Sequence, residues 1–77
     1  MITVLFFAQL QESAGCSQFQ LEQQEMTIKQ LKNVVQQQYP TVALQHVMTA
    51  VNEEFVLEEE VVKTGDVVAF IPPVSGG

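Results

Sequence analysis

This sequence of 77 residues has no tryptophan, no arginine and a single cysteine, Cys16. One cysteine excludes an intramolecular disulfide, and it excludes zinc or iron–sulfur sites that take several cysteines from one chain. Three lysines against nine acidic residues give a formal net charge of −6. Because phosphate binding requires a basic patch, the composition argues against nucleic acid as a partner. A partner with a basic face would be attracted, although solubility alone also accounts for the charge.

Long hydrophobic runs are also missing. No apolar stretch approaches the length of a membrane span. The N-terminal segment MITVLFFAQL has neither a positively charged start nor a small-residue cleavage site, so it does not resemble a signal peptide. We therefore predict a cytoplasmic protein without a membrane segment. The apolar fraction of 47% suffices for one core, and we expect a single domain over residues 1–77 with a flexible C-terminal tail over 72–77.

The first third of the chain predicts two strands. Residues 1–7 are apolar almost throughout, which is typical of a central strand that is buried on both faces. Residues 8–15 are polar and end in Gly15, which favours a loop or a short helical turn closed by glycine. Residues 17–22 alternate polar and apolar side chains and predict a half-buried strand that pairs with the first one as a hairpin.

The clearest helix signal begins at Thr27. Thr27 and Gln30 have the spacing of a capping box, while Met26 and Leu31 have that of a hydrophobic staple. Pro40 ends the predicted helix near the residue before it. The apolar stripe of this helix, which needs a sheet to pack against, consists of Ile28, Leu31, Val34, Val35 and Tyr39.

The second half predicts short strands. Residues 41–48 leave a short helix and an irregular connection both open. Two short strands at 49–52 and 55–57 flank a tight turn, and residues 64–66 form another turn. The acidic run Glu58–Glu60 has the composition of a solvated loop. Residues 67–71 form a second apolar strand, which Pro72 ends because it lacks a backbone donor.

These elements combine into one simple arrangement. The two apolar strands, at opposite ends of the chain, fit side by side in the middle of a sheet. If they run parallel, the stretch with the helix supplies the long crossover that such a pair requires. The helix then covers one face of a mixed sheet. The fold class is α+β, a roll of the β-grasp or ubiquitin-like type.

Side chains suited to catalysis are scarce. His46 is the only histidine, no basic group is near Cys16 in sequence, and no glycine-rich loop follows a strand. A surface histidine and an inert cysteine are the plainer interpretations of these two residues. We therefore expect the body of the domain to catalyse nothing by itself.

The C-terminal tail, PPVSGG, has one reactive group that no side chain offers, the terminal α-carboxylate. Gly76 and Gly77 have no Cβ atoms, which permits threading into a narrow channel of an activating enzyme. Pro72 and Pro73 stiffen the approach and lower the entropy cost of insertion. A merely frayed end is the alternative interpretation.

Three separated segments resemble the small-subunit family of molybdopterin synthase, the sulfur carriers of molybdenum cofactor biosynthesis. They are ITVLFFAQLQESAG at the start, AVNEEFV in the middle and GDVVAFIPPVSGG at the end. A terminal Gly-Gly alone is weak evidence for the family, because ubiquitin and several sulfur carriers share it. The longer ending, PPVSGG after GDVVAF, is specific evidence. Residues 58–60 and 41–48 have no counterpart in the resemblance, which leaves partner specificity open. The resemblance implies a β-grasp fold, in agreement with the pattern.

The resemblance also implies a mechanism. An adenylyltransferase like those that activate ubiquitin uses ATP and magnesium on the Gly77 carboxylate, and a sulfur donor converts it to a thiocarboxylate. The large synthase subunit supplies the catalytic groups, and sulfur passes to cyclic pyranopterin monophosphate. No metal or cofactor is expected on this chain, and a heterotetramer with the large subunit is implied.

Site residues follow from the same resemblance. Gly77 is the reacting terminus, Gly76 keeps the tail slender, and Val74 and Ser75 line it. The residues expected at the partner interface are Phe7, Phe55 and Ile71, to which Glu53 and Glu54 could add charge. Ordinary core packing is the alternative for these apolar residues, above all for Phe7.

Three other functions remain open. The first is a sulfur carrier of another pathway, such as thiamine synthesis. The second is a ubiquitin-like modifier that becomes linked to protein lysines. The third is an interaction module whose tail has no chemical role.

Overall fold

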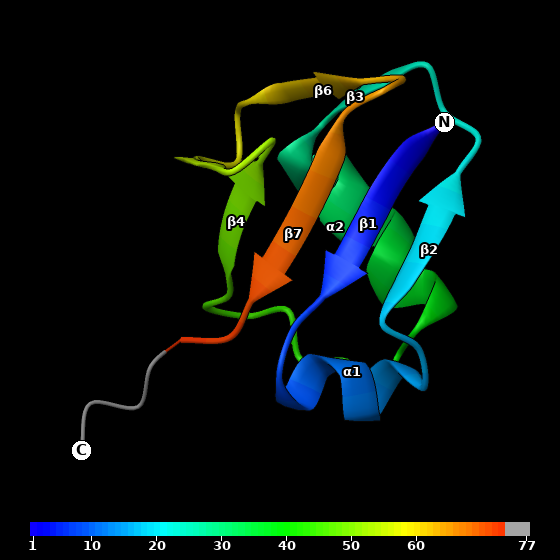
Figure 1. Cartoon of the computed structure of the whole chain (residues 1–77), viewed down its shortest axis with the longest axis vertical. Helices are drawn as coiled ribbons and strands as arrows, with labels where there is room; N and C mark the ends of the chain where they lie inside the picture. The colour runs from blue at the N-terminus through cyan, green and yellow to red at the C-terminus, as the bar shows by residue number, and fades with distance from the viewer. Residues whose placement is uncertain (74–77) are drawn as a thin grey trace.

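A five-stranded mixed sheet forms the centre of the computed structural model, which describes residues 1–73 (Figure 1). The strand order is β2-β1-β7-β4-β5. The central pair, β1 and β7, is parallel, and the other three pairings are antiparallel. The prediction that the two apolar strands lie side by side in the middle of the sheet is therefore confirmed. The strands span Ile2–Phe6 (β1), Gln18–Leu21 (β2), Met48–Val51 (β4), Glu54–Val56 (β5) and Val67–Ile71 (β7).

Helix α2 (Ile28–Gln38) packs across one face of this sheet, behind β1 and β7 in Figure 1. Its first turn has the predicted capping box. The Gln30 N–H donates to the Thr27 hydroxyl at 3.2 Å, and the Thr27 N–H donates to the Gln30 side chain at 3.0 Å. The helix ends at Gln38, two residues before Pro40, as predicted. Its fully buried side chains are Ile28, Leu31 and Val35.

Two short strands were not predicted from the sequence. β3 (Glu25–Thr27) and β6 (Val61–Lys63) form a separate antiparallel ladder in which Met26 pairs with Val62. Three residues are too few for an alternating pattern, so no signal distinguished them from a loop. Residues 58–60 lie before β6 and are exposed, as predicted. Their backbone has a structural role as well, because the carbonyls of Glu60 and Glu58 accept from the first two N–H groups of α2 at 2.9 and 3.1 Å.

For residues 8–15 and 41–48 the sequence left two alternatives open, and the structure shows which one each stretch adopts. Residues Gln9–Ala14 form a short helix, α1, which Gly15 ends in the left-handed conformation at φ 80°. The stretch 41–47 is an irregular connection rather than a helix. It is held down by the Gln36 side chain, which donates to the Val42 carbonyl at 2.8 Å.

One prediction about β1 is wrong. The strand was expected to be buried on both faces, yet only Ile2, Val4 and Phe6 are fully buried, against α2. On the other face Leu5 is half-buried and Phe7, just after the strand, is 42% exposed. Among residues 1–73 no helix or strand covers that face of the sheet (Figure 1).

A polar network joins the two turns at one end of the sheet. Asn52, in the β4–β5 turn, donates from its side-chain amide to Asp66 at 3.0 Å and accepts from the Val67 N–H at 3.0 Å. The other Asp66 oxygen accepts from the Lys63 N–H at 2.9 Å. Hydrogen bonding to the backbone of Lys63, and then to Asn52, lowers the pKa of Asp66.

This lowered pKa predicts a pH-dependent stability. The pKa of Asp66 in the folded protein lies below the ordinary value of about 3.9. Its contribution to the free energy of unfolding is therefore complete above that value and is lost as the pH falls through the folded pKa. We expect Asp66→Asn to melt below the wild type near pH 6, with the difference shrinking below about pH 4. Thermal unfolding between pH 2.5 and 7 checks this, and a difference that stays constant with pH would contradict it.

Candidate functional site on the open sheet face

The uncovered face of the sheet contains one row of paired residues across four strands. Leu5 of β1 pairs with Ala69 of β7. Ala69 also pairs with Ala50 of β4, which in turn pairs with Phe55 of β5. Because directly paired residues point to the same face, all four side chains lie on this face. The two alanines in the middle are small, which leaves a hollow between Leu5 and Phe55.

This hollow is a cavity of about 530 Å³ lined mostly by apolar side chains. Phe55 stands at one edge with 69% of its side chain exposed, and Val67 is 38% exposed. Isolated exposed apolar residues are ordinary, but a contiguous apolar surface around a hollow is typical of a protein interface. The full lining is Leu5, Phe7, Ala50, Asn52, Glu53, Phe55, Val67, Ala69 and Ile71.

All three predicted interface residues line this one cavity. The alternative that Phe7 belongs to the core does not hold, because its side chain is 42% exposed. Phe7 directly follows β1 and donates its N–H to the Phe70 carbonyl at 3.3 Å, which places it beside the end of β7. Ile71 is the last residue of β7. The cavity therefore extends to the point where the C-terminal tail leaves the sheet (Figure 1).

The tail itself is described only at its beginning. Pro72 is half-buried and Pro73 is exposed. The remaining predicted tail residues, Val74, Ser75, Gly76 and Gly77, lie outside the described residues. Their roles stay predictions.

Sequence reasoning missed the middle of the cavity. The sequence predicts strands through Leu5, Ala50 and Ala69 but no surface role for them, because an apolar run does not say which of its two faces is covered. A weak signal did exist, since alanine is a poor strand former and two alanines in paired strands leave a gap.

The two acidic residues that were expected to add charge at the interface are both exposed. On the rim of the cavity, Glu53 adopts a positive φ of 72° in the β4–β5 turn. Glu54 is exposed at the start of β5.

The side chains of Cys16 and His46 do not form a catalytic pair. The Cys16 thiol is half-buried and donates to the Tyr39 hydroxyl at 3.7 Å, an interaction that raises the pKa of Tyr39. Tyr39 packs in turn on Phe6 and Phe19 at ring distances of 5.5 and 5.1 Å. His46 is exposed in the connection before β4. Within residues 1–73 no three His, Cys, Asp or Glu side chains gather as a metal site would require.

No helix in the described part of the chain is both long and apolar enough to span a bilayer.

Comparison with known proteins matches residues 4–77 to the ThiS family. The molybdopterin synthase sulfur carrier subunit of Haemophilus influenzae is 37% identical over 81 residues, and that of Escherichia coli K12 is 36% identical, each alignment covering all of both chains. Among solved structures, the modifier protein SAMP1 from Haloferax volcanii superposes with a TM-score of 0.83 at 24% identity, covering 99% of this chain and 98% of that chain. A complex of subunits 1 and 2 of molybdopterin-converting factor from Helicobacter pylori gives 0.71 at 24% identity, covering 99% and 97%. These likenesses show the ubiquitin-like β-grasp fold.

Proposed function

We propose that this chain, which belongs to the ThiS family, is the sulfur carrier subunit of a molybdopterin synthase. The observation that carries the proposal is full-length identity of 36–37% to two carrier subunits of that name. The specific ending PPVSGG and the open apolar cavity, which reaches Ile71 just before that ending, support the same function. The cavity offers a surface on which a partner can hold the domain while it receives the tail.

The proposed chemistry takes place at the Gly77 carboxylate. One carboxylate oxygen attacks the α-phosphorus of ATP, which forms an acyl-adenylate and releases pyrophosphate. A donor then delivers sulfur at the oxidation level of sulfide to the acyl carbon, AMP leaves, and the terminus becomes a thiocarboxylate. Sulfur is a better nucleophile than oxygen, so the thiocarboxylate sulfur can attack a side-chain carbon of cyclic pyranopterin monophosphate and displace an oxygen substituent from that carbon. Hydrolysis of the resulting acyl link leaves sulfur on the pterin and restores the carboxylate.

The proposed partner for sulfur delivery is the large subunit of the synthase. The structurally similar Helicobacter pylori protein is found in a complex of subunits 1 and 2. In our proposal the large subunit covers the cavity around Phe7, Phe55 and Ile71 and supplies the catalytic groups, and two copies of each subunit make a heterotetramer. A hydrophobic centre with charged groups at the rim is the usual composition of such an interface.

The proposed partner for loading is an adenylyltransferase of the ubiquitin-activating type. It would bind the ATP and magnesium, so that this chain needs no cofactor of its own. Because the proposed activation consumes ATP, we propose the cytoplasm as the place of the reaction. Alternation between two partners requires that neither holds the carrier permanently.

The experiment that tests the proposal is an intact mass measurement of the protein isolated from its native cells, with thiol alkylation and mapping of the C-terminal peptide. We expect an alkylated Gly77 terminus in part of the population. Exchange of oxygen for sulfur adds nearly the same mass as oxidation of one of the three methionines, so the position of the alkyl group decides the assignment. A bare carboxylate in every molecule in the presence of the activating system contradicts the proposal, and isopeptide adducts on lysines indicate a protein modifier.

A further inference from the structure

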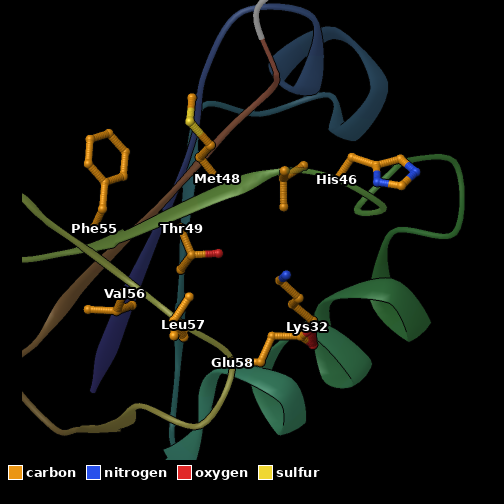
Figure 2. A pocket seen from close by; sticks show the side chains of 9 residues that line it. Lys32, His46, Met48, Thr49, Phe55, Val56, Leu57 and Glu58 are labelled. Carbon is orange, nitrogen blue, oxygen red and sulfur yellow. The ribbon is translucent and has the colours of Figure 1, made fainter.

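A second groove lies between α2 and strands β4 and β5, and it shares Phe55 with the apolar cavity (Figure 2). Its volume is about 460 Å³, and Lys32, Thr49 and Glu58 contribute polar groups to its lining. A neighbouring hollow of about 300 Å³ shares Lys32, His46 and Glu58 with it and adds Lys29. Apart from Phe55, no residue of these two hollows has a role in the proposed sulfur transfer.

The floor of this groove contains a polar atom without a protein partner. Thr49 is only 5% exposed, and its side-chain oxygen has no hydrogen-bond partner among the described residues. A buried hydroxyl without a partner destabilises a fold by about 1–3 kcal/mol. Valine would fill a similar space on the pleated strand without that cost. Buried polar groups in native proteins are otherwise almost always satisfied, so a hydroxyl in this position requires an explanation.

One lysine, Lys32, and one carboxylate, Glu58, line the groove beside this hydroxyl. The protein carries three lysines in a chain of net charge −6, and two of them, Lys29 and Lys32, lie along these hollows. In Figure 2 the Lys32 ammonium and the Thr49 hydroxyl point into the same space between helix and sheet. The His46 ring lies at the rim and points toward the preceding connection. A cation and a hydroxyl donor that converge on one space are suited to the oxygens of an anion.

We propose that this groove is a binding site for a small oxyanion, a phosphate or carboxylate group, held by the Lys32 ammonium and the Thr49 hydroxyl. The Thr49 oxygen is covered when the groove is empty, so its donation requires side chains at the floor to move. Glu58 opposes the anion from the same lining, and we therefore expect Glu58→Gln to tighten binding.

Titration of the ¹⁵N-labelled protein with inorganic phosphate, followed by NMR, tests the site. We expect saturable shifts at the amides of Lys32 and Thr49, whereas sodium chloride at matched ionic strength causes none. Lys32→Gln should weaken phosphate binding about tenfold, the usual effect of losing one charge-assisted hydrogen bond. Lys63→Gln is the matched control, because Lys63 lies in β6 outside this lining and should leave affinity unchanged. A parallel titration with acetate shows whether the site prefers a phosphate or a carboxylate group, since a site for carboxylates binds acetate as well as phosphate.

Thr49→Val separates a binding role from a packing role. We expect this variant to melt a few degrees higher, because it removes an unsatisfied buried hydroxyl, and to bind phosphate about tenfold more weakly. Wild-type phosphate affinity in Thr49→Val, or phosphate shifts no larger than those caused by chloride, would overturn the proposal. Neither result would affect the proposed sulfur transfer, which is tested at Gly77.

Discussion

Removal of Gly77 is expected to abolish thiocarboxylate formation while the melting temperature stays unchanged. The described core consists of side chains between Ile2 and Phe70, and glycine has no side chain to add to a core, so we expect the deletion to leave the fold intact. The carboxylate would then belong to Gly76 and would lie one residue, about 3.5 Å, short of the adenylation site. A displacement of even 1 Å can slow an enzymatic step about a hundredfold. We therefore expect a loss of at least that size in sulfur transfer with the activating enzyme, the sulfur donor and the large subunit present.

The matched control for this deletion is Gln37→Ala, a change at an exposed position on α2 that keeps the length of the tail and its two terminal glycines. It should retain sulfur transfer within about threefold of wild type, because surface changes of this kind are nearly neutral. Mass spectrometry of the C-terminal peptide measures loading, and pterin analysis measures delivery. A deletion variant that still accumulates a thiocarboxylate would contradict the assignment of Gly77 as the reacting group.

Phe55→Glu is expected to weaken binding to the large subunit by about a hundredfold or more, which corresponds to about 2.7 kcal/mol. Phe55 is 69% exposed at the edge of the apolar cavity, so the substitution should leave the fold intact. In the proposed complex, however, the new carboxylate would be removed from water inside an apolar interface. Burial of an unpaired charge is among the costliest changes at a protein contact.

Leu57→Glu provides a control of the same chemistry at a neighbouring position. Leu57 is 76% exposed but does not line the cavity, so its replacement should change affinity by less than about threefold. Calorimetry with the purified large subunit measures both variants. If the two weaken binding equally, the partner covers the β5 edge in general, and the assignment of the interface to the open sheet face is wrong.

Most of the fold could be predicted because its signals are local. A capping box at Thr27 and Gln30 and a proline at position 40 delimit α2 within a few residues. The two apolar strands could be paired because a long connection with a helix is the usual link between parallel neighbours. The short ladder of β3 and β6 could not be predicted, since it depends on Met26 meeting Val62, which is far away in the sequence.

For the functional site, too, the local features could be predicted from the sequence and the long-range ones could not. By itself the sequence determined the five strands of the main sheet, helix α2 and the Gly-Gly ending, because backbone preferences and side-chain periodicity act between near neighbours. Only the tertiary structure decided that Leu5 and Phe7 face outward, that two alanines open a hollow between them and Phe55, and that Asn52 meets Asp66. Side-chain alternation separates the two faces of a strand, but which face stays uncovered depends on the strands and helix that pack around it.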